Sequence, residues 1–196
     1  MPTDVDIAAT YPALARPVRW RNTALTGCHL VTGPPDTTLL QSVNLVPFVD
    51  DRVIVIALEN GHIMLPGGTR EAGETLLETI TREMEEETGY RLRTCHPFAA
   101  LECVSYDATP WRPHLPHPAF ERLVCFGDVV PDGLPTNPAD AEQIAHVDLL
   151  PVPAAVAVLR DAGRPELADV YRLAADIRAT DHQLVDLCVD GAPRCR

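Results

Sequence analysis

An acidic run near the middle of the chain holds the residues best suited to chemistry. Four carboxylates lie within five positions, directly after an arginine: Glu83, Glu85, Glu86 and Glu87 follow Arg82. On one helix such carboxylates repel each other, by a few tenths of a kcal/mol for each i,i+4 pair. Hard divalent cations, Mg2+ foremost, prefer sites with several carboxylate oxygens. The run therefore indicates a metal site on a helix, preceded by a glycine-containing loop.

The segment from Thr75 to Thr88 is expected to form that helix, with about four turns. It contains no Gly or Pro, and Gly73 and Gly89 bracket it. At roughly 100° per residue, its apolar side chains share one edge. The members of this edge are Leu76, Leu77, Ile80 and Met84.

The same helical phase sorts the carboxylates into two groups. Glu83, Glu86 and Glu87 fall on an arc beside the apolar edge, whereas Glu78 and Glu85 point to solvent. A solvated acidic face without metal is the alternative, because charge runs usually form such faces. The glycines and Arg82, which stand at fixed offsets from the carboxylates, favour the metal site.

The whole pattern from Gly68 to Tyr90, G-x5-E-x7-R-E-U-x-E-E-x-G-U with U a bulky apolar residue, resembles the Nudix box. Every defining position is met, over about an eighth of the chain. The resemblance implies a Nudix hydrolase of the MutT-like kind: an α/β fold, arranged as an α/β/α sandwich with a mixed β-sheet. It also implies hydrolysis of a nucleoside diphosphate linked to another group, with Mg2+ or Mn2+ as cofactor.

Within the box we expect Glu83, Glu86 and Glu87 to be the metal ligands. The resemblance adds a backbone carbonyl from Gly67 or Gly68, where a side chain would obstruct the approach of metal and phosphate. Pyrophosphate cleavage needs neutralised phosphate oxygens, a positioned water and a base, and metal ions can supply the first two.

Arg82 has two interpretations. It can pair with Glu74 or Glu86 and tie the loop to the helix, or it can touch phosphate as a catalytic residue. The resemblance favours the orienting role, which makes Glu74 and Gly89 structural members of the box.

The general base is left open between the box helix and a distant loop. Glu86 or Glu83 can act through a metal-bound water. Related enzymes also use a carboxylate from a distant loop, and Asp132, Asp140 and Glu142 are available there.

Substrate contacts are expected from a proline-rich loop, Asp107–Pro118, because long loops in compact domains tend to be functional. Trp111 and Arg112 are candidates to stack on a base and hold a phosphate. Arg70, in the box loop, is a candidate phosphate contact. The alternatives are a surface loop stiffened by its prolines and a solvated Arg70. His114 and His117 are interpreted as loop decoration rather than a metal site.

Composition excludes several functions. The net charge is −12 and all sixteen basic residues are Arg, so broad nucleic-acid binding is not expected. Without Lys, a P-loop lysine or a Schiff base is impossible. No apolar stretch approaches the ~20 residues that span a bilayer, and the acidic N-terminus lacks a secretory apolar region. We expect a cytoplasmic protein with a small nucleotide-type substrate, and a homodimer is left open.

We predict three regions: residues 1–40 as an N-terminal extension with one or two strands, 41–155 as the Nudix hydrolase domain, and 156–196 as a C-terminal helical segment packed on the same domain. Expected strands are Val43–Val49, Arg52–Leu58, His62–Leu65, Phe98–Val104, Leu123–Val130 and Ile144–Leu149, and Leu65–Gly68 is expected to be a turn. An amphipathic helix is expected at Pro165–Arg178.

The sequence thus predicts a Mg-dependent pyrophosphohydrolase acting on a nucleotide, a nucleotide sugar or a dinucleoside polyphosphate. The alternative is a non-catalytic Nudix module that binds a ligand or regulates. A purely structural acidic protein without metal is a further alternative. No pattern outside the box selects the substrate.

Overall fold

The computed structural model describes residues 6–138 and 143–180. The helices are α1 (Ile7–Thr10), α2 (Leu76–Thr88), α3 (Val152–Asp161) and α4 (Pro165–Thr180). The strands are β1 (Val18–Trp20), β2 (Thr23–Leu30), β3 (Leu40–Val49), β4 (Arg52–Leu58), β5 (Ile63–Met64), β6 (Gly67–Thr69), β7 (Tyr90–Leu92), β8 (His96–Ser105), β9 (Ala119–Pro131) and β10 (Ile144–Pro151).

The strands form one mixed sheet whose main order is β1-β2-β8-β9-β3-β4-β10. Strands β3 and β9 are parallel in its centre, and the other pairs along this order are antiparallel. Three short strands join at its margins, β5 on β4, β6 on β3 and β7 on β9. The mixed sheet of an α/β fold, expected from the sequence, is confirmed.

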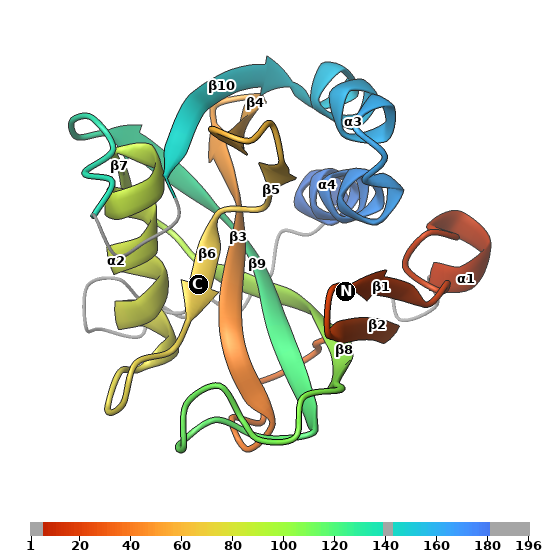
Figure 1. Cartoon of the computed structure of the whole chain (residues 1–196). Coiled ribbons are helices and arrows are strands. Elements are labelled where there is room, and N and C mark those ends of the chain that lie inside the picture. Colours follow the sequence, from red (N-terminus) through yellow and green to blue (C-terminus); the bar gives the residue numbers. More distant parts are fainter. Residues whose placement is uncertain (1–5, 139–142, 181–196) are drawn as a thin grey trace.

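Alternation along the central strands divides the core into two layers. On β3, Val43 and Leu45 belong to one apolar cluster, with Ile80 and Met84 of α2. Val46, the residue after Leu45, belongs to the other cluster, which includes residues of α3 and α4. Because successive side chains point to opposite faces of a sheet, helices must cover both faces. Figure 1 shows α2 on one side of the sheet and α3 and α4 on the other, which is the expected sandwich.

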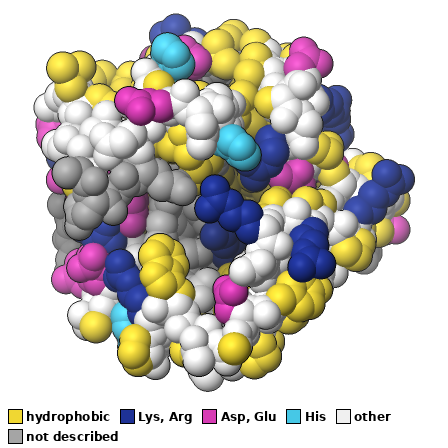
Figure 2. Space-filling view, viewed as in Figure 1, with side chains coloured by type: hydrophobic (Ala, Val, Ile, Leu, Met, Phe, Trp, Pro, Cys, Tyr) yellow, Lys and Arg dark blue, Asp and Glu magenta, His cyan; other side chains and the backbone are white. Residues whose placement is uncertain are grey.

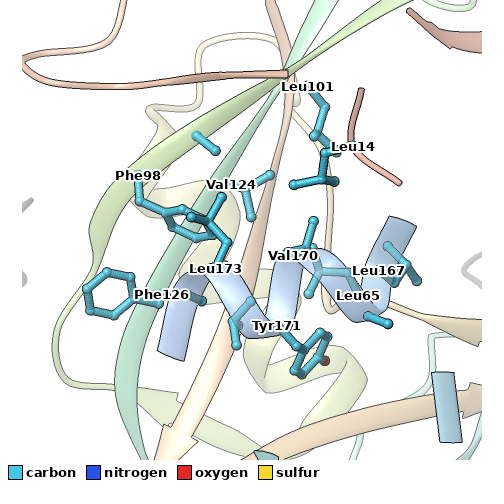
Figure 3. Packing of buried hydrophobic residues seen from close by; sticks show 14 of the residues in the cluster. Leu14, Leu65, Phe98, Leu101, Val124, Phe126, Leu167, Val170, Tyr171 and Leu173 are labelled. Atoms are coloured by element: carbon cyan, nitrogen blue, oxygen red, sulfur yellow. The ribbon is translucent and has the colours of Figure 1, made fainter. Parts of the chain in front are cut away.

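Helix α4 contributes a row of buried residues to the second layer, among them Leu167, Val170, Tyr171 and Leu173. Figure 3 shows Leu173 near Phe98 of the sheet and Leu167 near Leu65. The hydroxyl of Tyr171 donates a hydrogen bond to the Ile54 carbonyl at 2.7 Å. Burial raises the pKa of Tyr171 far above its ordinary value, so this group acts as a neutral donor.

Most expected elements are confirmed, with boundaries that differ by a few residues. The expected turn at Leu65–Gly68 is wrong in its second half, since Gly67 begins β6 and pairs with Asn44 of β3. Helix α3 was not predicted as a separate element, although part of it lies in the expected helical segment 156–196. Pro153 is tolerated in its first turn, where no intrahelical N–H bond is lost.

The N-terminal hairpin belongs to the main sheet. Strand β2 pairs with β8, from Thr23 opposite Ser105 to Leu30 opposite Ala99. Within the described ranges, no helix is long and apolar enough to cross a membrane.

Candidate active site

Helix α2 is fixed at both ends by local sequence. Thr75 is the N-cap: its hydroxyl accepts from Glu78 N at 3.2 Å, and its N–H donates to Glu78 Oε2 at 2.8 Å. This capping box satisfies two N–H groups that the first turn leaves without helical partners. Gly89 ends the helix in the left-handed region at φ 70°, which favours glycine. The two caps fix where the helix begins and ends.

The glycine loop lies in direct contact with the carboxylate arc of α2. Gly67 N donates to Glu87 Oε2 at 2.8 Å, in a buried hydrogen bond. A Cβ on Gly68 would lie 2.1 Å from Glu83 Oε1. Only glycine permits this approach, so the backbone of the loop and the carboxylates of α2 come together at one place.

Arg82 joins the loop to the helix. Its Nε and Nη2 bind Glu74 Oε1 and Oε2 at 2.9 and 3.1 Å, a two-pronged ion pair. Its Nη1 lies 2.9 Å from Glu83 Oε1 and 3.3 Å from Glu86 Oε2. The bond from Arg82 lowers the pKa of Glu74 to about 2. Arg82 thus pairs with Glu74 of the loop and with Glu83 and Glu86 of the helix.

The donor set suits a divalent cation at two carboxylates. Glu83 Oε1 and Glu86 Oε2 converge on one point, the Arg82 Nη1 atom, which carries positive charge. Burial raises the pKa of Glu83, against the opposing effect of Arg82. The Gly68 backbone lies beside this carboxylate, since a Cβ there would meet Glu83 Oε1.

Glu87 differs from the other two acidic candidates. It is buried, with 9% of its surface exposed, and one carboxylate oxygen already binds Gly67 N. Among the described residues, no three His, Cys, Asp or Glu side chains converge tightly enough to hold a metal ion as they stand. Glu83 and Glu86 therefore fit a metal better than Glu87 does.

The distant-loop candidates for a base are only partly placed. Asp132 is exposed, and its Oδ1 lies 3.5 Å from Arg91 Nε. Asp140 and Glu142 lie outside the described residues.

The proline-rich loop is held against the box loop by two contacts. His114 Nε2 lies within hydrogen-bond distance of the Arg70 carbonyl, at 3.1 Å. Arg112 Nη1 lies 3.8 Å from Glu71 Oε1, and its Cζ stands 5.6 Å from the centre of the Trp111 ring. Trp111 is 77% exposed. The structure therefore brings Arg70, Trp111 and Arg112 to one edge of the box.

Sequence reasoning missed a group of residues across the sheet from α2. A cavity of about 90 Å³ reaches Gly67 and Gly68. Its other lining residues include Trp20, Ser42, Asn44, Arg122 and Arg164. A second cavity, of about 360 Å³, shares Trp20 and Arg122 and extends to Trp111. No local pattern marks these residues, since they come from separate elements.

Comparison with protein families gives one match: the NUDIX domain, over residues 39–174. No curated protein matches the sequence. The matched range contains the glycine loop, α2 and the central strands, and it leaves out the hairpin β1–β2.

Solved structures resemble the chain more distantly. A UDP-X diphosphatase is 20% identical with a TM-score of 0.41, over 61% of this chain and 54% of that one. A Bacillus subtilis pyrophosphohydrolase is 15% identical with a TM-score of 0.49, over 76% and 98%. An ADP compounds hydrolase is 19% identical with a TM-score of 0.47, over 70% and 72%. The chain thus spans about half the length of the first of these.

Proposed function

The chain belongs to the Nudix family, and from this premise we propose that it hydrolyses a pyrophosphate bond in a nucleoside diphosphate linked to another group. The linked group is a nucleotide, a sugar or a second nucleoside. The reaction depends on Mg2+, or on Mn2+ in its place.

One observation carries the proposal. Glu83 and Glu86 converge on a single cationic point, at 2.9 and 3.3 Å from Arg82 Nη1, and Gly68 backbone lies against Glu83. Two converging carboxylates beside exposed backbone form an oxygen-rich site for a hard cation. Helix α2 carries the two carboxylates, and strand β6 holds the Gly68 backbone beside them.

The residues of the chain divide the work of the reaction. Glu83 and Glu86 would hold the ion, with a carbonyl of Gly67 or Gly68, and Glu87 would join them or keep Gly67 in place. When bound, the ion neutralises phosphate oxygens and lowers the pKa of a water. A carboxylate of the site would accept a proton from the attacking water as the bond from phosphorus to the bridging oxygen breaks, and the bridging oxygen would leave with the departing phosphate group.

Glu86 is the carboxylate that we propose as the proton acceptor, with Glu83 as the alternative. The side chain of Glu86 is 26% exposed and that of Glu83 only 13%. A water reaches Glu86 more easily, and a general base must lie within hydrogen-bond reach of that water. Arg82 orients both carboxylates by its Nη1, while its other nitrogens bind Glu74.

Arg70, Trp111 and Arg112 are proposed to bind the substrate. Trp111 presents an exposed ring at the edge of the larger cavity, which suits stacking on a base. Arg112 lies over that ring, and Arg70 lies in the box loop close to His114. Both guanidinium groups suit phosphate.

The proposal is tested by incubating the protein with nucleoside triphosphates, nucleotide sugars and dinucleoside polyphosphates. Hydrolysis is followed with Mg2+ and again in EDTA. We expect Mg-dependent cleavage of at least one class, and a loss of turnover by orders of magnitude in Glu86→Gln. Glu85→Gln is the matched control, because Glu85 lies on the same helix but is exposed.

Metal binding has its own readout. A ligand that binds only the folded state raises the melting temperature by mass action, so Mg2+ should stabilise the wild type and Glu85→Gln more than Glu86→Gln. If no compound is cleaved although nucleotides bind, the chain is a non-catalytic ligand-binding module. If Mg2+ shifts every variant equally, the ion binds elsewhere.

A further inference from the structure

The N-terminal hairpin, strands β1 and β2, lies outside the matched family range but lines the larger cavity. The residues from Trp20 to Thr23 form one wall of this cavity of about 360 Å³. Trp111 and His117 of the proline-rich loop belong to its lining too, as does Arg122 of β9. A cavity of this size lies in the ~300–1,000 Å³ range of small-molecule sites.

The larger cavity leads to the box through Trp20 and Arg122. These two residues also line the smaller cavity of about 90 Å³, whose far end is Gly67 and Gly68. Strand register explains the arrangement, because Arg122 of β9 stands opposite Ser42 of β3. A ligand that enters at the hairpin can therefore extend as far as the backbone of Gly67 and Gly68.

Several buried polar atoms in these cavities lack partners. Ser42 is 2% exposed, and its Oγ has no hydrogen-bond partner among the described residues. The buried atoms Trp20 Nε1 and His117 Nδ1 also have no hydrogen-bond partner among the described residues. Buried polar groups nearly always have partners in folded proteins. Three such atoms along one path point to a polar ligand that supplies the missing bonds.

The path also carries positive charge in an acidic chain. Arg122 Cζ lies 5.6 Å from the centre of the Trp20 ring, a cation–π distance. Arg164 lines the smaller cavity, fixed by Glu166 Oε1 and the Ile63 carbonyl, both at 2.7 Å. Figure 2 shows arginine side chains, dark blue, in the middle of this face. Guanidinium groups suit phosphate oxygens.

We infer that Trp20 and Arg122 are specificity-determining residues that bind the nucleoside phosphate part of the substrate. The base lies in the larger cavity between Trp20 and Trp111, and its phosphate lies beside Arg122, directed toward Gly68. The hairpin thus selects the nucleotide, while α2 performs the chemistry. The inference rests on the proposed function for the class of substrate.

The two tryptophans allow a test that does not depend on hydrolysis. Trp20 and Trp111 are the only tryptophans of the chain, so Trp111→Phe leaves Trp20 as the sole indole emitter. The probes are AMP, GMP, CMP and UMP in Mg2+ buffer, which contain no pyrophosphate bond. We expect at least one of them to change Trp20 emission saturably, because a stacked base alters the indole environment.

Arg122→Gln, made in the same background, should raise the half-saturating concentration about tenfold or more. The matched control is Arg19→Gln, since Arg19 is exposed and its Cζ lies over Tyr106 rather than Trp20. Ribose 5-phosphate should leave the emission unchanged, because it carries no aromatic base to stack on the indole. Trp20→Phe should raise the KM for hydrolysis more than it lowers kcat.

The inference is overturned if none of the four nucleotides changes Trp20 emission while Trp111→Phe still hydrolyses the substrate. It is also overturned if ribose 5-phosphate changes Trp20 emission as the nucleotides do, since the cavity then recognises sugar and phosphate rather than the base. If Arg122→Gln and Arg19→Gln have equal half-saturating nucleotide concentrations, Arg122 has no part in nucleotide binding. Failure of the proposed function gives a different result. In that case no compound is cleaved, although the nucleotides still change Trp20 emission.

Discussion

Replacing Gly68 by alanine would place a methyl group inside the site. The new Cβ would lie 2.1 Å from Glu83 Oε1 and 2.5 Å from Glu83 Cδ, where real Cβ contacts are not found below 3.0 Å. The carboxylate must therefore move by about 0.9 Å or more. It is the end of a flexible side chain, so the loss of folding free energy should stay near ~0.5–1.5 kcal/mol, the cost of an off-rotamer side chain.

The effect on catalysis should be much larger than the effect on folding. A displacement of ~1 Å at a catalytic group can cost about 10²-fold in rate, or roughly 2.7 kcal/mol. We expect Gly68→Ala to melt within about 6 °C of the wild type, at ~2–4 °C per kcal/mol, while its turnover falls about a hundredfold.

Gly67→Ala provides the contrast. Its Cβ would lie 2.3 Å from the Val43 carbonyl oxygen and 2.7 Å from Asn44 Cα, both backbone atoms of β3, at φ +128°. Backbone strain of ~1–3 kcal/mol adds to overpacking of similar size, so the melting temperature should fall by at least about 4 °C. Gly33→Ala is the control, because nothing lies within 4 Å of its Cβ.

The assays are thermal unfolding without metal and turnover at saturating substrate. Wild-type turnover in Gly68→Ala would refute the link between the position of Glu83 and the chemistry. A wild-type melting temperature in Gly67→Ala would show that β3 yields to the methyl group.

The remaining predictions concern folding, pH and substrate. Glu87→Gln should lower the melting temperature by about 2–4 °C, because Gly67 N loses a charged acceptor worth ~1 kcal/mol more than a neutral one; Glu86→Gln should not, and equal shifts would contradict this. Glu74 has its pKa lowered from 4.5 to about 2, so its ion pair stabilises fully above pH ~4.5 and is lost as pH falls toward 2. The melting temperature of Glu74→Gln should therefore approach that of the wild type on acidification, and a constant gap would exclude the pair as the cause. Trp111→Ala should raise the half-saturating substrate concentration about ten- to a hundredfold, from ~1–3 kcal/mol of lost stacking, with little change in single-turnover rate at saturation; unchanged binding would make the loop a scaffold.

Elements with local signals could be read from the sequence. The hairpin of β3 and β4 follows from two β-branched runs around Asp50 and Asp51. Strand β6 could not be predicted, because Gly67 and Gly68 have low strand propensity. These residues form a strand since β3 lies beside them and pairs with them. Helix α3 could have been found, because Val152, Ala155, Val156 and Leu159 stand at helical spacing.

The box helix is the part of this protein that the sequence determined by itself. Its period, its caps and the direction of its carboxylates depend on contacts three or four residues apart, and the structure shows Glu78 and Glu85 exposed as expected. Spacing within one helix translates directly into geometry.

Tertiary structure alone decided what surrounds that helix. The Gly67 N–H engages Glu87 because β6 pairs with β3. Trp20, Ser42 and Arg122 come from β1, β3 and β9, and they line one cavity because of the strand order β1-β2-β8-β9-β3. Strand register over such sequence separations depends on the burial of whole faces rather than on any local pattern, so the residues of the site outside the box could not be read from the sequence.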